Sequence, residues 1–269
     1  MRSEPEANRK FHWILTGQAS ILSRVYSDAD TAALYDAMNS WDPEAWPGDG
    51  FYNEYVTAAS AVLDVGCGTG SMLHCARESG HTGRLVGLDP DEPSLDWARR
   101  RTDIEWVEGF AADAGARWQA EFDLATMTGH AFQCLVGDDV VAASLASVWE
   151  ALRPSGRFVF ETRHPQARAW ETWNPSNESA VVDEAGRAVR IWNDVVEVLD
   201  DLVTVSETIA QQDGTVLRVD RETLRFLDVA RLDAFLAEAG FEIEARYGDW
   251  KLGPITAESR EVITVARRP

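Results

Sequence analysis

The sequence predicts an α/β protein built on a seven-stranded, mostly parallel sheet with helices on both faces, plus a small antiparallel β lid inserted after the fifth strand. Three observations support this prediction. A short apolar strand at 61–65 ends in three alternating glycines, Gly66, Gly68 and Gly70, and a helix-forming segment follows at once. Segments typical of strands and helices then alternate through the fifth strand, which is the pattern of a parallel sheet. From 164 to 226 dense β-branched residues replace this pattern, which indicates antiparallel strands.

Each predicted element follows from its own residue pattern. Apolar residues at helical spacing predict helices, and short apolar or β-branched runs bounded by turn residues predict strands. The segment 40–50 is too rich in turn residues for regular structure. The expected helices are one or two in 11–39, then 51–59, 71–79, 91–101, 138–152 and 228–239. The expected strands are 61–65, 85–89, 104–107, 121–128, 158–162 after a turn at 153–157, a hairpin of 188–198 and 202–209, then 216–219, 223–227, 241–247 and 261–267.

Composition narrows the possible partners and the compartment. The chain has 269 residues, of which 45% are hydrophobic, and this is enough for one substantial core. Its net charge of −20 disfavours nucleic acid and anionic membranes, because both attract basic surfaces. Three cysteines form no disulfide framework, and no apolar run is long enough to span a membrane. We therefore expect a cytoplasmic protein whose partner is a small molecule, while its oligomeric state stays open.

The glycine turn indicates the kind of ligand. Glycine can adopt positive φ and has no Cβ, so a ligand can lie directly against this backbone. The third glycine comes one residue earlier than in the G-x-G-x-x-G pattern of dinucleotide folds. Asp64 precedes the turn, and its carboxylate would repel a phosphate but attract an amino group or a sulfonium. The run D-V-G-C-G-T-G resembles the D-x-G-x-G-x-G motif of class I S-adenosylmethionine-dependent methyltransferases; a glycine turn with a structural role only is the alternative.

This resemblance covers roughly residues 50–163 and 228–267 and implies a division of the chain. It implies a Rossmann-like core at 61–163 and 227–269 that binds S-adenosylmethionine, and an N-terminal helical flap at 1–60 over the cofactor. The insertion at 164–226 is then the β lid.

The resemblance also implies cofactor contacts. Asp89 ends the second strand, 19 residues beyond Gly70, where a carboxylate can accept both ribose hydroxyls; an ordinary strand-ending aspartate is the alternative. After the third strand Phe110 stands where the family commonly has an acid, so either Asp113 contacts the adenine amine or Phe110 lines the adenine pocket. The implied cofactor-binding residues are Asp64, Gly66, Cys67, Gly68, Gly70, Asp89, Pro90, Ala111, Ala112 and Thr128.

Methyl transfer from a sulfonium requires oriented reactants and a dry site, and sometimes a general base, but no metal. His130, in the segment G-H-A-F-Q after the fourth strand, is the first candidate base because imidazole titrates near neutral pH. His164, after the fifth strand, is the second candidate. For both histidines, binding the substrate or bracing a loop is the alternative. His74 and Cys75 are adjacent but lack two further ligands, so we expect no metal site.

Aromatic residues suggest how an acceptor is held. Trp170 and Trp173, with Trp192 and Trp250, are expected to form an aromatic wall for an apolar or cationic acceptor, and packing of the lid is the alternative for each. Tyr35, Trp41, Trp46 and Tyr52 are the candidate contacts of the flap, again with simple packing as the alternative. The predicted substrate-binding residues are Tyr35, Phe132, Gln133, Arg163, Trp170 and Trp173.

The sequence therefore predicts a class I S-adenosylmethionine-dependent methyltransferase that methylates an oxygen or nitrogen atom of a small molecule. A peptide or protein carboxyl methyltransferase is one alternative. A non-catalytic S-adenosylmethionine-binding protein and a nicotinamide oxidoreductase are the others.

Overall fold

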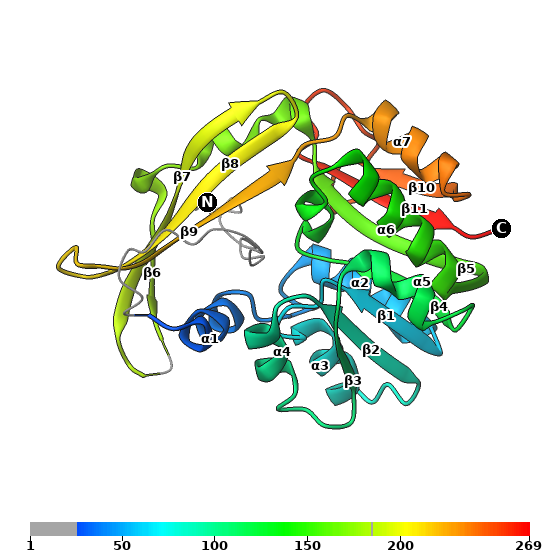
Figure 1. The fold of residues 1–269 in the computed structure, drawn as a ribbon, viewed down its shortest axis with the longest axis horizontal. Coiled ribbons are helices and arrows are strands. Elements are labelled where there is room, and N and C mark those ends of the chain that lie inside the picture. Colours follow the sequence, from blue (N-terminus) through cyan, green and yellow to red (C-terminus); the bar gives the residue numbers. More distant parts are fainter. Residues whose placement is uncertain (1–25, 184) are drawn as a thin grey trace.

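The computed structural model describes residues 26–183 and 185–269, and these residues form two separate β-sheets (Figure 1). The larger sheet has seven strands in the order β10-β11-β5-β4-β1-β2-β3. Strands β1 to β5 run parallel to one another, whereas β11 is antiparallel to both β5 and β10. This is the predicted seven-stranded, mostly parallel sheet. Its strands are β1 Ala61–Val65, β2 Arg84–Asp89, β3 Glu105–Glu108, β4 Phe122–Met127, β5 Leu152–Arg163, β10 Glu242–Tyr247 and β11 Glu261–Arg267.

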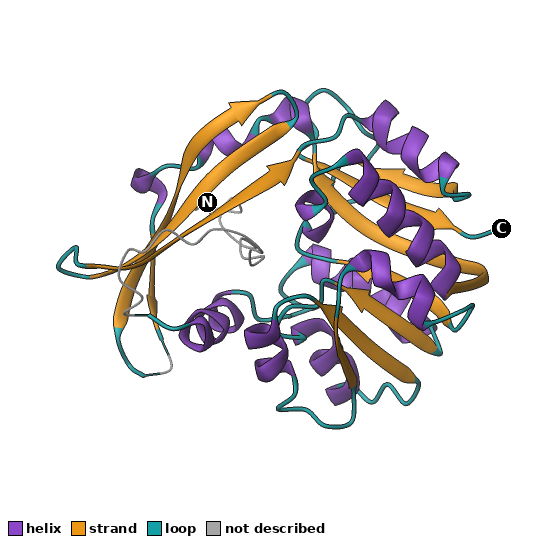
Figure 2. Cartoon of the chain, in the orientation of Figure 1, coloured by secondary structure: helices purple, strands orange, loops and turns teal. Residues whose placement is uncertain are grey.

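Helices cover both faces of this sheet, as predicted (Figure 2). One face packs against apolar residues of α6 and α7, and the other packs against those of α2 and α3. The strand β1 is buried along its whole length, which explains its continuous apolar sequence. The helices are α1 Asp28–Met38, α2 Pro47–Ala58, α3 Ser71–Glu78, α4 Glu92–Ala98, α5 Ala114–Arg117, α6 Asp138–Ala151 and α7 Val229–Glu238. Short 3-10 turns lie at Ala111–Asp113 (η1), Ala131–Cys134 (η2), Pro165–Ala167 (η3), Ala169–Thr172 (η4) and Pro175–Asn177 (η5).

The order in which strands are added to the sheet reverses at β1. Successive strands β1, β2 and β3 extend the sheet to one side, while β4 and β5 lie on the other side of β1. In an open α/β sheet, ligands bind outside the carboxyl ends of the strands at this switch point. The loops after β1, β2, β4 and β5 therefore converge on one edge.

The second sheet is antiparallel and lies between β5 and α7 in the chain, which confirms the inserted β structure. Its strands are β6 Ser179–Val182, β7 Ala188–Leu199, β8 Leu202–Gln211 and β9 Val216–Arg225. One face of this sheet packs on two groups of residues. At one end it contacts Tyr26, which precedes α1, and Leu34 of α1. At the other end it contacts Trp173 and Phe226. We call it the inner face, and Figure 1 shows the sheet beside the α/β core.

Several predicted boundaries were wrong. The segments 216–219 and 223–227 were expected as two strands but form the single strand β9, because polar residues between them continue the pairing with β8. The predicted turn at 153–157 lies inside β5, where pairing with β4 shifts register and Ser155 has φ 67°. The sequence did not predict β6. Of the helices expected in 11–39, only α1 falls within the described residues, and predictions for residues 1–25 lie outside them.

In the described part of the chain, every helix is too short or too polar to cross a membrane. The same residues contain no group of three or more His, Cys, Asp or Glu side chains that could hold a metal ion.

Candidate functional site

The predicted glycine turn connects β1 to α3. Gly66, Gly68 and Gly70 all have positive φ, at 71°, 52° and 78°. A Cβ on Gly70 would lie 2.4 Å from the ring of Trp106, so this position excludes side chains by space as well as by backbone conformation. The Gly66 amide donates to the Leu88 carbonyl at 2.7 Å, which fastens the turn to the end of β2. The sequence motif therefore builds a bare, left-handed backbone loop at the switch point.

Asp89 fixes this loop from the neighbouring strand. Its carboxylate is fully buried and accepts one hydrogen bond from the Gly68 amide at 2.7 Å and one from the Asp91 amide at 2.8 Å. Burial raises the pKa of Asp89 to about 7, although the two backbone amides act in the opposite direction. Each carboxylate oxygen has two lone pairs, so the group keeps acceptor capacity for hydroxyl donors.

A second buried carboxylate lies at the end of β1. Asp64 is 1% exposed and accepts a hydrogen bond from the Thr126 hydroxyl at 2.8 Å. Burial raises the pKa of the Cys67 thiol, and the charges of Asp89 and Asp64 add to this effect, so both carboxylates lie near the loop. The Thr69 hydroxyl is also buried there, and it has no hydrogen-bond partner among the described residues. These two carboxylates, which accept hydrogen bonds and carry negative charge, suit a ligand that carries both hydroxyl groups and positive charge.

His130 occupies the loop after β4 in a constrained conformation. Gly129 and His130 are consecutive left-handed residues, with φ 67° and 65°. The His130 amide donates to Glu161 Oε1 at 2.9 Å, and its ring Nε2 lies 2.9 Å from Glu261 Oε2. The Tyr52 hydroxyl donates to the other oxygen of Glu161, which is fully buried.

His164 lies nearby, after β5, but its contacts are local. Its amide donates to the Arg260 carbonyl at 2.7 Å, and its ring Nδ1 accepts from the Gln166 amide at 3.2 Å. Burial lowers the pKa of His164. These contacts favour the bracing alternative for this histidine, because its ring nitrogen caps its own turn.

Comparison with known proteins assigns this geometry to a family. Residues 62–156 match the family model described as a methyltransferase domain, and this range extends from β1 through the glycine turn into β5. The chain is 28% identical over 222 residues to a cypemycin N-terminal methyltransferase from Streptomyces sp, covering 77% of this chain and 82% of the relative. Both matches support the assignment of the chain to the class I S-adenosylmethionine-dependent methyltransferases.

Two further similarities agree with this assignment. The methyltransferase is 28% identical over 222 residues to a dTDP-3-amino-3,4,6-trideoxy-alpha-D-glucopyranose N,N-dimethyltransferase from Streptomyces venezuelae, covering 80% of this chain and 84% of the relative. The solved structure of S-adenosylmethionine-bound CalS10, an amino pentose methyltransferase from Micromonospora echinaspora, shares its fold. The TM-score is 0.63 at 22% identity, over 96% of this chain and 100% of that one. The chain is thus an enzyme whose cofactor is S-adenosylmethionine, and this replaces the nicotinamide alternative.

The predicted adenine side of the cofactor site follows β3. Ala111 is buried and Ala112 is exposed in the short turn η1, while Phe110 is 53% exposed just before it. The Asp113 carboxylate accepts from the Phe110 amide at 2.8 Å and so caps its own turn. This arrangement favours Phe110, of the two alternatives, as the residue that lines the adenine. Among the other predicted contacts, Pro90 is half-buried and Thr128 is buried at the end of β4.

The helix α1 lies against the cofactor side of the methyltransferase. Burial raises the pKa of the Tyr35 hydroxyl, and the Asp89 carboxylate adds to the effect, so this side chain lies near the predicted ribose contact. Charges of Cys134 and Glu161 also act on Tyr35, which therefore lies between the β2 and β5 ends of the site. The predicted position of Tyr35 in the site agrees with these neighbours, and its contact with substrate stays a prediction.

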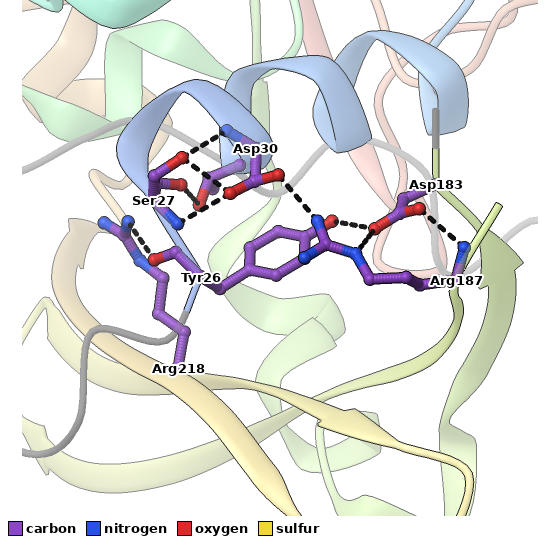
Figure 3. Close-up of polar contacts among 7 residues, drawn as sticks. Tyr26, Ser27, Asp30, Asp183, Arg187 and Arg218 are labelled. Carbon is purple, nitrogen blue, oxygen red and sulfur yellow. Dashed lines mark hydrogen bonds and ion pairs between the residues drawn. The ribbon is translucent and has the colours of Figure 1, made fainter. Parts of the chain in front are cut away.

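The start of α1 is tied to the inserted sheet (Figure 3). Arg187 donates to Asp183 and to Asp30, both at 2.6 Å, and its guanidinium lies 4.7 Å from the centroid of the Tyr26 ring. The Tyr26 hydroxyl donates to Asp183 at 3.1 Å, and Arg218 of β9 donates to the Tyr26 carbonyl. We call Tyr26, Asp30, Asp183 and Arg187 the α1 latch. It joins α1 to the turn between β6 and β7.

Two predicted substrate residues are buried beside β5. The Phe132 ring is 2% exposed and stacks on Phe160, with centroids 4.6 Å apart. Gln133 is fully buried, donates to the Arg225 carbonyl at 3.0 Å and accepts from Arg163 at 2.8 Å. These contacts connect η2 to β5 and β9, and they give both side chains a structural role that the sequence did not reveal.

The predicted wall of four tryptophans is not formed. Trp170 and Trp173 both pack on Phe226, and their ring centroids lie 4.5 and 6.1 Å, respectively, from the Phe226 centroid. The Arg163 guanidinium lies 5.4 Å from the centroid of the Trp173 ring. Trp250 instead packs on aromatic residues of α2. Trp192 lies on the outer face of β7, because the adjacent Ile191 packs on the inner face. Only Trp170 and Trp173 therefore remain candidates for an acceptor contact.

Sequence reasoning missed the carboxylates of β5 and β11. Glu161 and Glu261 contact His130, but the sequence pattern places them only in strands. One signal was available for Glu161, which interrupts the apolar run F-V-F-E-T of β5. A carboxylate in a fully buried strand is costly unless it has partners, so such a residue deserves consideration as part of a site.

Proposed function

We propose that this methyltransferase transfers the methyl group of S-adenosylmethionine to an amino nitrogen of a small molecule. The main structural support for this proposal is the acidic inner face of the inserted sheet. Glu222 pairs across from the buried Val205 in β8, and Glu207 is two residues further along that strand, so both carboxylates lie on the inner face. Such a surface attracts an ammonium group and repels a carboxylate, which argues against the carboxyl methyltransferase alternative.

The position of Glu222 relative to the core supports this proposal. Its charge acts on the Cys134 thiol in η2, after β4, and on the guanidinium of Arg163, the last residue of β5. Burial lowers the pKa of Arg163, whereas the charges of Glu261, Glu222 and Glu161 oppose that change. Carboxylates from both sheets therefore lie near Arg163, at the carboxyl end of β5.

The names of two relatives point in the same direction. The cypemycin enzyme is an N-terminal methyltransferase, and the Streptomyces venezuelae enzyme is an N,N-dimethyltransferase of an amino sugar nucleotide. The second name specifies methylation of nitrogen, and the first specifies an N-terminus, which is the position of an amino group. Together with the acidic inner face, they favour a nitrogen acceptor over an oxygen acceptor for this chain.

The proposed mechanism assigns a role to each part of the chain. When bound, the cofactor supplies a methyl group on a sulfonium, which is activated for in-line displacement. The turn of Gly66, Gly68 and Gly70 with Asp64 would hold its methionine end, and Asp89 would accept from its ribose hydroxyls. His130 would take the proton from the acceptor ammonium. The core 61–163 and 227–269 would thus bind the cofactor, while the flap 1–60 and the lid 164–226 exclude water.

An acceptor screen tests the proposal. The purified protein is incubated with S-adenosylmethionine and a panel of amino sugars and short peptides with free N-termini, each paired with a hydroxyl counterpart of the same shape. S-adenosylhomocysteine formation and the mass and fragmentation of products are measured. We expect turnover of amines with N-methylated products. Turnover of the hydroxyl counterparts alone, or methyl esters as products, would contradict the proposal.

A further inference from the structure

We infer that Glu261 is a positioning residue for methyl transfer, and that it acts by fixing the tautomer and orientation of His130. The inference rests on the proposed methylation of an amine. It adds a residue from the last strand of the chain to a site otherwise built from the ends of β1, β2, β4 and β5.

The conformation of His130 is the first step. A left-handed residue with a side chain is unfavourable and persists only where its surroundings fix it, and such residues concentrate at functional sites. Here Glu161 holds the backbone through the His130 amide, and Glu261 holds the ring through Nε2, each at 2.9 Å. Two carboxylates from adjacent strands, β5 and β11, therefore fix this one residue at both ends.

The two carboxylates have different tasks. Both oxygens of Glu161 accept hydrogen bonds, from His130 and from Tyr52, and the side chain is fully buried. Glu161 is thus a backbone anchor. Glu261 is the first residue of β11 and pairs with Arg163 of β5, so the strand pairing sets its position beside the histidine ring. The His130 and Glu261 side chains are 11% and 18% exposed, which keeps their contact largely out of water.

The contact between Glu261 and His130 determines which ring nitrogen of His130 can accept the proton of the acceptor. In neutral imidazole one nitrogen is a donor and the other an acceptor, and a carboxylate can only accept. Glu261 therefore selects the tautomer protonated at Nε2 and leaves the lone pair at Nδ1. When the acceptor ammonium loses its proton to Nδ1, the amine gains the lone pair that forms the N–CH3 bond as the S–CH3 bond breaks. The imidazolium that results is stabilised by the Glu261 charge.

Several other charged groups face this pair and bear on its titration. They come from different elements. Glu161 and Arg163 lie on β5. Burial raises the pKa of Tyr52 on α2, and the charges of Glu161, Asp64 and Glu261 add to this effect. The charges of Glu161 and Glu261 stabilise protonated imidazole, and that of Arg163 destabilises it. Replacing Glu261 by a neutral residue is therefore expected to shift the protonation equilibrium of the His130 ring toward the neutral form.

The test compares Glu261→Gln with the matched control Glu258→Gln, which removes an exposed charge three residues earlier, in the loop that precedes β11. For Glu261→Gln we expect kcat to fall at least about tenfold, since a placed base contributes 10²–10⁴-fold. The acidic limb of the pH–rate profile should move to lower pH. Affinity for S-adenosylhomocysteine should stay within about threefold, because binding does not use the base. Glu258→Gln should match the wild type.

An activity-independent measurement separates this inference from the proposed function. Nitrogen-15 NMR of the unliganded wild type, with His130→Asn used to assign the signal, should show His130 protonated at Nε2. The same signal should lose this preference in Glu261→Gln. A wild-type ring protonated at Nδ1, or a Glu261→Gln variant with the wild-type pH profile and kcat, overturns the inference. Failure to methylate any amine, with the NMR result as expected, would count against the proposed function alone.

Discussion

If Asp89 holds the ribose of the cofactor, as proposed, its high pKa makes cofactor binding sensitive to pH. In the unliganded protein this carboxyl has a pKa of about 7, because the group is completely buried. Ribose hydroxyls donate hydrogen bonds, so they favour the ionised carboxylate over the neutral acid. Cofactor binding at Asp89 must therefore lower its pKa and release a proton. Affinity should rise as pH increases through 7 and then level off.

The pKa also determines the size of the effect. With a pKa of about 7, roughly one carboxyl in eleven is ionised at pH 6 and about ten in eleven at pH 8. If the cofactor binds only the ionised form, its affinity increases about tenfold over this interval, which equals about 1.4 kcal/mol. At pH 6 close to one proton should be released for each molecule bound. At pH 8 the release should be close to zero.

Titration calorimetry with S-adenosylhomocysteine measures both quantities when each pH is examined in two buffers of different ionisation enthalpy. The control is Asp89→Asn, in which the affinity should be at least about tenfold weaker, since a hydrogen bond to a charged group contributes about 1.5–3 kcal/mol. The pH dependence due to this position should also disappear in the variant. Equal proton release by the wild type and the variant would assign the effect to another group, such as His130, and refute the reasoning.

Two stability predictions follow from the glycine turn and the α1 latch. Gly70→Ala should destabilise the protein by about 1–3 kcal/mol more than Gly80→Ala in thermal unfolding, because both sites have positive φ but only Gly70 would meet the Trp106 ring. Arg187→Gln should cost about 1–3 kcal/mol, because it leaves the buried Asp183 carboxylate with one partner fewer, and should speed amide exchange in α1; unchanged exchange would contradict the latch.

The glycine turn could be predicted because it is local in sequence. The motif D-V-G-C-G-T-G contains a strand end, a turn and a helix start, and the left-handed turn follows from the glycines themselves. The inserted sheet was also predictable, since β7 and β8 are joined by the short turn at Asp200 and Asp201 and form a hairpin. Their pairing follows from chain proximity.

The contacts of His130 could not be predicted in the same way. Glu161 is 31 residues away in sequence and Glu261 is 131 residues away, so only the strand order brings β11 beside β5 and its glutamate to the ring. The aromatic wall failed for a related reason. Residue type suggested that Trp192 could line a site, but the alternation of side chains along β7 places it on the outer face. Such facts depend on register, which composition does not specify.

The inner face of the inserted sheet offers the most direct test of acceptor class. Replacing the whole insertion would be uninformative, because Gln133 and Cys134 of η2 contact it from the core. A single neutralisation avoids this difficulty. Glu222→Gln keeps the size of a half-buried inner-face residue but removes its charge, so the KM for an amine acceptor should rise at least about tenfold, with cofactor affinity unchanged. Glu197→Gln removes an equal charge from the exposed outer face of β7 and should change neither value. If the two variants have the same KM, the acidic inner face does not bind the acceptor, and the case for an amine would rest on the relatives alone.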